Sequence, residues 1–304
     1  MGTEVYVILS TPFYPDGGID YASFDRLVEH CVQAGATGLT VLGQMGEAPK
    51  LEHAESVAIL RRLCSRVDVP VVVGVTAPGF AAMRALTREA TDAGAAGVMI
   101  APPTNLRTDD QIVTYYRQAS DAIGTEVPIV VQDYPLTFTV QMTPRVIRRI
   151  ADEVEGVYML KHEDWPGLEK ISALRALEAS ARGPLRILTG NGALFLDFEM
   201  ERGADGAMTG YSFPELLTGV VRLSAEGRRD EAHDLFDAHL PLIRYEQQQG
   251  VGLAVRKYIL MRRGLLDSDA QRTPAGALSA TARQEVDYLL DRLARADSGV
   301  RLSR

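Results

Sequence analysis

Lys161 is the residue of this chain best suited to covalent chemistry. It ends an apolar run, Val157 to Lys161, and it is one of only four lysines in a chain whose positive charge comes mostly from arginine. An amine can lose its proton and attack a carbonyl carbon, whereas a guanidinium cannot. Apolar surroundings would lower the pKa of this amine and favour Schiff-base formation. The alternative is a lysine at a strand end whose ammonium group reaches water.

A second candidate is the glycine turn Gly43-Gln44-Met45-Gly46-Glu47, which follows a short apolar run. Two glycines in a tight turn let neighbouring backbone N–H groups point at one position, which suits a carboxylate. The same glycines would also serve an ordinary connection between a strand and a helix. The meaning of the turn therefore depends on the elements that would bring it close to Lys161.

The elements expected to position these residues are repeated strand–helix units. A helix-ending glycine, one or two small residues, a second glycine and an apolar run occur at 34–42, 93–100 and 203–209. Glycine after a helix takes the left-handed cap conformation, and the apolar run after it is typical of a buried parallel strand. In all, the sequence predicts eight strands, at residues 4–10, 38–43, 70–75, 97–101, 128–132, 157–161, 186–190 and 205–209.

Eight such units predict an α/β fold, a (β/α)8 TIM barrel, over residues 1–225. A doubly wound sheet would need a glycine fingerprint after the first strand, where Thr11-Pro12-Phe13 stands instead. Beyond residue 226 the pattern predicts a C-terminal extension of about three helices, over 226–304. TIM-barrel chemistry lies at the C-terminal ends of the strands, which is where both Lys161 and the glycine turn fall.

Composition excludes several other classes of protein. The net charge of -8 argues against nucleic acid or an anionic membrane surface as the main partner, because both need clustered cations. No apolar run approaches the length of a membrane span, and the first residues lack the pattern of a signal peptide. Cys31 and Cys64 lack metal-ligand spacing, so we expect buried free thiols and no metal site. These features predict a soluble, cytoplasmic protein.

In this order and spacing, the motifs resemble the dihydrodipicolinate synthase/N-acetylneuraminate lyase family of class I aldolases. The resemblance rests on Thr11-Pro12-Phe13, on Gly43 to Glu47, on a strand ending before Pro135, and on Lys161. It implies that Lys161 holds a pyruvate-type 2-oxo acid as a Schiff base. It also implies that the acid's carboxylate lies near the N–H groups of Gln44 and Met45. Members are usually homotetramers that need no metal or organic cofactor.

The chain departs from the family at positions that matter for the reaction. Gln44 and Met45 replace two hydroxyl residues, and Gln132 and Thr104 stand where proton-relaying tyrosines are expected. Thr137 occupies the position of an arginine found in synthases. These changes disfavour dihydrodipicolinate synthesis.

Two residues could replace the proton relay. Tyr134 and Glu163 each lie two positions beyond a site residue and would share its face in an extended segment. The alternatives are a loop tyrosine before Pro135 and an acid that begins the next helix. His162 should point away toward the helices, and Arg107 could meet a distal carboxylate or simply lie in solvent.

The resulting prediction is a lyase that acts on a 2-oxo acid through a Schiff base on Lys161. It would perform aldol cleavage, condensation or dehydration, for example of a 2-keto-3-deoxy sugar acid, although Met45, Phe138, Met208 and Tyr211 would suit a less polar tail. The alternatives are the synthase itself, a silent 2-oxo-acid-binding barrel, and a phosphate-binding enzyme that uses Gly190, Gly192 and Gly210. The predicted catalytic residues are Lys161, Tyr134 and Glu163, and the predicted substrate-binding residues are Gly43, Gln44, Met45, Gly46, Gln132, Gly190 and Met208.

Overall fold

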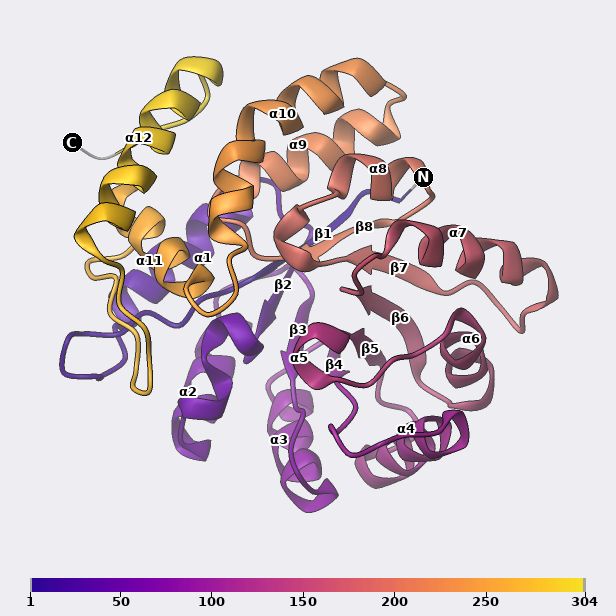
Figure 1. The fold of residues 1–304 in the computed structure, drawn as a ribbon. Coiled ribbons are helices and arrows are strands. Elements are labelled where there is room, and N and C mark those ends of the chain that lie inside the picture. The colour runs from indigo at the N-terminus through magenta and orange to yellow at the C-terminus, as the bar shows by residue number, and fades with distance from the viewer. Residues whose placement is uncertain (1, 303–304) are drawn as a thin grey trace.

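Eight parallel strands close into a barrel in the computed structural model, which describes residues 2–302 (Figure 1). Each strand pairs with its neighbours in chain order, and β1 pairs with β8 to close the ring. All eight predicted strands are confirmed, with ends that shift by at most two residues. They are β1 Glu4–Ile8, β2 Gly38–Val41, β3 Val71–Gly74, β4 Gly97–Ile100, β5 Ile129–Asp133, β6 Val157–His162, β7 Arg186–Thr189 and β8 Gly206–Thr209.

The helices surround the barrel, and glycines end several of them as the repeated pattern predicts. Gly35, Gly94 and Gly203 have φ values of 89°, 85° and 95°, a left-handed conformation that costs glycine little. A capping box at Thr108 begins α4. The barrel helices are α1 Tyr21–Gln33, α2 His53–Cys64, α3 Phe80–Asp92, α4 Asp109–Ile123, α6 Pro144–Glu153, α7 Leu168–Leu177, α8 Leu196–Glu201 and α9 Pro214–Ala225, with a short α5 Pro135–Phe138 after β5.

Three further helices follow the barrel, as predicted: α10 Arg229–Glu246, α11 Gly252–Arg262 and α12 Ala280–Ala296. The first of them packs along α9, and α12 packs against α10 (Figure 1). The segment between α11 and α12 returns to the barrel mouth, where the Arg272 guanidinium donates to the carbonyl oxygen of Gly17 at 2.6 Å. The extension therefore contacts the loops that surround the C-terminal ends of the strands.

The barrel interior is filled by one layer of large apolar side chains, without a pore. Side chains from seven of the strands form this layer, and burying each contributes roughly 1.5–3 kcal/mol. Its members are Tyr6, Ile8, Val72, Met99, Val130, Met159, Leu188 and Met208. Because strand side chains alternate, the inward position after Met159 on β6 belongs to Lys161, one layer nearer the mouth.

Candidate active site

A lysine, a carboxylate and an amide meet at the mouth of the barrel. The Lys161 Nζ lies 2.8 Å from Glu163 Oε2, and Gln132 Nε2 donates to the same oxygen at 2.7 Å. The three residues are 4–5% exposed. Gln132 and Lys161 are register partners on β5 and β6, so the sheet itself places them side by side. This arrangement holds a nucleophilic amine next to a group that can take up and return its proton.

Glu163 reaches Lys161 because the strand conformation continues past the end of β6. The N–H of Glu163 donates to the carbonyl oxygen of Asp133 at 2.9 Å, which extends the β5–β6 pairing by one step. The alternative, in which Glu163 begins the next helix, is wrong because α7 starts at Leu168. The expectation that Glu163 shares a face with Lys161 is confirmed by their ion pair.

The glycines after β7 and β8 make room for protein side chains. A Cβ on Gly190 would lie 2.2 Å from Glu163 Cγ, and one on Gly192 would lie 1.6 Å from Gln247 Nε2. A Cβ on Gly210 would lie 2.6 Å from Arg256 Nη1. These glycines thus have a steric role around the Lys161 site, which leaves the phosphate-loop interpretation without its main support.

The opposite face of the same strand ends carries a second buried polar cluster. Lys170 Nζ lies 2.6 Å from Asp133 Oδ2 and 2.9 Å from Asp164 Oδ2. His162 Nε2 lies 3.1 Å from the carbonyl oxygen of Gly167, so His162 points toward the helix layer as predicted. This cluster ties α7 to β5 and β6 directly behind Gln132 and Lys161.

The glycine turn is fixed by the only carboxylate within it. Glu47 is 2% exposed and has a left-handed backbone with φ 54°. Its carboxylate accepts from Lys257 at 2.5 Å and from Lys50 at 2.8 Å. Gln44 and Met45 begin the 3-10 turn that this anchor holds, and the first N–H groups of a helical turn have no partner within it. The turn can therefore present N–H donors to a carboxylate.

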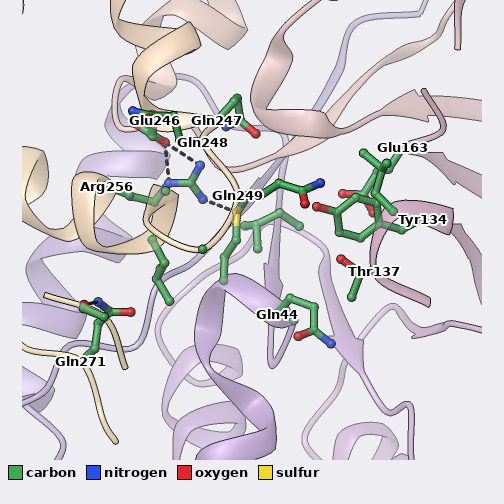
Figure 2. Close-up of a pocket in the computed structure, with 18 of the residues that line it drawn as sticks. Gln44, Tyr134, Thr137, Glu163, Glu246, Gln247, Gln248, Gln249, Arg256 and Gln271 are labelled. Carbon is green, nitrogen blue, oxygen red and sulfur yellow. Dashed lines mark hydrogen bonds and ion pairs between the residues drawn. The ribbon is translucent and has the colours of Figure 1, made fainter. Parts of the chain in front are cut away.

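Tyr134 lies at the edge of the cavity, beside Glu163 in Figure 2. Burial raises the pKa of the Tyr134 hydroxyl, and the nearby Glu163 carboxylate raises it further. A hydrogen bond with the Thr137 side chain acts in the opposite direction on this pKa. Tyr134 is therefore a protonated hydroxyl near neutral pH, close to the carboxylate that contacts Lys161.

Most of the predicted site residues line one cavity of about 440 Å³. Three do not: Gly46 is buried beneath the turn, Gly190 makes room for Glu163, and Met208 lies in the interior layer of the barrel. Arg107 is exposed and donates to the carbonyl oxygen of Thr104, away from this cavity. Those that line it are Gly43, Gln44, Met45, Gln132, Tyr134, Lys161 and Glu163.

Comparison with known proteins agrees with this geometry. Residues 2–293 match the model of the Dihydrodipicolinate synthetase family. The chain belongs to this family. Like its other members, it is a lyase of the class I aldolase/dehydratase type.

Two curated members of the dihydrodipicolinate synthetase family show how the chain relates to different activities. It is 32% identical to an L-2-keto-3-deoxyarabonate dehydratase from Azospirillum brasilense, covering 95% of this chain and 94% of the relative. It is 29% identical to a 4-hydroxy-tetrahydrodipicolinate synthase from Chlorobium luteolum, covering 94% of this chain and 95% of the relative. Among solved structures, a dihydrodipicolinate synthase from Rhodopseudomonas palustris is 61% identical with a TM-score of 0.93, covering 96% and 99% of the two chains.

The sequence analysis did not predict that the C-terminal helices contribute side chains to the site. Arg256 of α11 and Glu246 at the end of α10 line the cavity, and Arg256 Nε donates to Glu246 Oε1 at 2.6 Å. Glu246 Oε2 accepts from the Ser212 hydroxyl at 2.5 Å, and Arg256 also contacts the Met45 thioether. No local sequence pattern marked these two residues, although the polar run Gln247-Gln248-Gln249 between the two helices also lines the cavity.

The sequence predictions about metal ligands, membrane helices and cysteines concern residues 2–302, which the structure describes. Over this range no group of His, Cys, Asp and Glu could hold a metal ion, and no helix is long and apolar enough to cross a membrane. Both cysteines are free. Cys31 is buried, and burial raises the pKa of its thiol to about 12, whereas Cys64 is only partly buried, contrary to expectation.

Proposed function

We propose that this lyase forms a Schiff base between Lys161 and the carbonyl carbon of a 2-oxo acid. The observation that carries the proposal is the buried Lys161 amine, 2.8 Å from Glu163 and open to a cavity of about 440 Å³. The amine attacks the C2 carbonyl, and water leaves as the imine forms. The substrate carboxylate at C1 is held by the N–H groups of Gln44 and Met45 in the glycine turn.

The protonated imine then acts as an electron sink for the bond that breaks. In a dehydration, a C3 proton leaves, an enamine forms, and hydroxide departs from C4 with a proton supplied by an acid. In an aldol cleavage, the C4 hydroxyl is deprotonated and the C3–C4 bond breaks. Glu163 is the acid–base group we assign to either route, with Tyr134 as the hydroxyl that relays protons beside it.

A 2-keto-3-deoxy sugar acid is the substrate class we favour, with dehydration or aldol cleavage as the reaction. Support comes from Gln132 and Thr137, which replace the tyrosine and arginine expected of a synthase, and from the similarity to a dehydratase. The second candidate is 4-hydroxy-tetrahydrodipicolinate synthesis. It is favoured by the 61% identity to a structure described as a dihydrodipicolinate synthase.

We further propose a cytoplasmic homotetramer, as the family resemblance implies. The expected partner is the small-molecule 2-oxo acid, without nucleic acid or membrane. The barrel over 1–225 and the extension over 226–304 would then form one catalytic unit, since both contribute to the cavity. Light scattering after size exclusion would test the tetramer, and a monomeric mass would contradict it.

Borohydride trapping with pyruvate tests the central step. Reduction should add a pyruvyl group to Lys161, detected by intact and peptide mass spectrometry. Lys161→Arg should give no adduct and no turnover, because guanidinium is a poor nucleophile at neutral pH. Turnover by folded Lys161→Arg, or an adduct on another lysine of the native enzyme, would disprove the assignment.

A further inference from the structure

The outer part of the cavity is built by the C-terminal extension and carries a neutralised charge. Arg256 and Glu246 are 3% and 2% exposed, and both line the cavity. Arg256 Nη2 lies 2.5 Å from Glu246 Oε1. Two hydrogen bonds from Ser212, one from its hydroxyl and one from its N–H, hold the other carboxylate oxygen in place. The Glu246 carboxylate is thus held by Arg256 through one oxygen and by Ser212 through the other.

The other two cations that line the cavity are also paired. Lys161 has Glu163 at 2.8 Å. The Lys50 ammonium contacts Glu47 at 2.8 Å and the carbonyl oxygen of Arg272 at 2.9 Å, although Glu47 is shared with Lys257. A carboxylate at the far end of a substrate would therefore lose its water without gaining a free cation.

We propose that Glu246 determines substrate specificity: by neutralising Arg256, it makes the cavity select 2-oxo acids with an uncharged hydroxylated tail over those with a second carboxylate. This inference rests on the proposed function, because it concerns the part of the substrate beyond the carbon bound to Lys161. A second carboxylate would share this space with Glu246 and Glu163, each already paired with the cation beside it. The cavity therefore offers no uncompensated positive charge to balance a second carboxylate, which disfavours such a ligand.

Amide side chains also line the part of the cavity that the substrate tail would reach. The loop 247–250 lines the cavity, and Figure 2 shows Gln249 between Arg256 and Tyr134. An amide both donates and accepts hydrogen bonds, so it matches a hydroxyl and leaves no charge unpaired. The Gln248 and Gln271 amides already donate to backbone carbonyls of Tyr245 and Gly276. We assign contact with the tail hydroxyls to Gln249.

A matched pair of substrates tests the selection. 2-Keto-3-deoxypentonate and 4-hydroxy-2-oxoglutarate have the same five-carbon chain and differ only at C5, which is a hydroxymethyl group in one and a carboxylate in the other. Substrate consumption measures either dehydration or cleavage. We expect kcat/KM for the pentonate to exceed that for the dicarboxylate by about 10²-fold or more, as for other sites that leave a buried group unpaired. Equal values, or a preference for the dicarboxylate, would overturn the proposal.

Glu246→Gln tests the residue itself. The variant keeps an acceptor for Ser212 but leaves the Arg256 charge free, so the preference for the pentonate should fall by about tenfold or more. Glu153→Gln makes the same chemical change in an exposed ion pair with Arg117 and should leave the preference unaltered. A folded Glu246→Gln enzyme with the native preference would refute the role of Glu246.

A second variant covers the case in which Glu246→Gln does not fold. Gln249→Leu changes an exposed residue and should raise KM for the pentonate about tenfold while pyruvate trapping on Lys161 persists. An unchanged KM would refute the contact. Pyruvate has no tail, so failed trapping would count against the Schiff base, whereas normal trapping with no preference between tails would count against this inference alone.

Discussion

Glu163 is the side chain on which the chemistry of Lys161 depends most directly. Its Oε2 contacts both the Lys161 amine and the Gln132 amide. Glu163→Gln should lower kcat about 10²–10⁴-fold, because an amide cannot carry a proton between substrate atoms. The imine with pyruvate should still be trapped, since Lys161 is intact. A kcat within a few-fold of the native value would remove Glu163 from the mechanism.

Tyr134 makes a separate prediction at the same scale. Tyr134→Phe removes only the hydroxyl that lies near Glu163, and the ring contact with Phe138 is kept. If that hydroxyl relays protons, kcat should fall about 10²-fold. Steady-state kinetics with the favoured sugar acid would measure it, with Tyr288→Phe on the exposed face of α12 as the control. A native rate would leave Tyr134 with a structural role beside Pro135.

The neighbours of Lys161 were predictable where strand geometry fixes the direction in which a side chain points. Alternation along β6 places Lys161 and Glu163 on one face and His162 on the other, and register places Gln132 beside Lys161. Arg256 and Glu246 were not predictable in this way. Their direction depends on how two helices of the extension pack on the barrel, and no local pattern encodes that packing.

Among the elements, α8 carries a buried acid behind the site. Burial raises the pKa of Glu199 to about 7, although the His162 imidazole and a hydrogen bond from Thr189 oppose the shift. In the unfolded chain this carboxyl ionises near 4.5. The unfolded state therefore loses the proton first, and the stabilising contribution present below pH 4.5 is lost as the pH rises to about 7.

Glu199→Gln should abolish this pH dependence. Relative to the native protein, the free energy of unfolding of the variant should increase by on the order of 2 kcal/mol between pH 5 and pH 8. Urea titrations at the two pH values would measure the difference. Glu153→Gln, which alters an exposed carboxylate, should show no such change. Parallel behaviour of the native protein and Glu199→Gln would mean that Glu199 is not a buried neutral acid.

The strands and their order were predictable because glycine caps and apolar runs mark each unit. How deep a strand-end residue lies inside the barrel was harder to predict. Met208 and Lys161 both lie near the ends of their strands, yet Met208 fills the interior layer while Lys161 opens to the cavity. The tilt and stagger of a barrel decide which layer a residue joins, and these depend on the closed sheet as a whole.

At the scale of the whole molecule, the extension should be inseparable from the barrel in folding. Phe236, Leu242 and Ile243 of α10 are buried, and each contributes roughly 1.5–3 kcal/mol when removed from water. We predict that a fragment of residues 1–225 will lack a cooperative thermal transition, as followed by circular dichroism. A cooperative transition in that fragment would instead make the barrel an independent domain.

The distribution of lysine has a practical consequence for labelling this protein. All four lysines lie within the described residues and pair with carboxylates: Lys50 and Lys257 with Glu47, Lys161 with Glu163, and Lys170 with Asp133 and Asp164. Three of them are at most 8% exposed, while arginine supplies the cations of the outer surface. Amine-reactive dyes and cross-linkers will therefore find almost no lysine on the exterior. A dye attached to a lysine will report mainly on the mouth of the barrel.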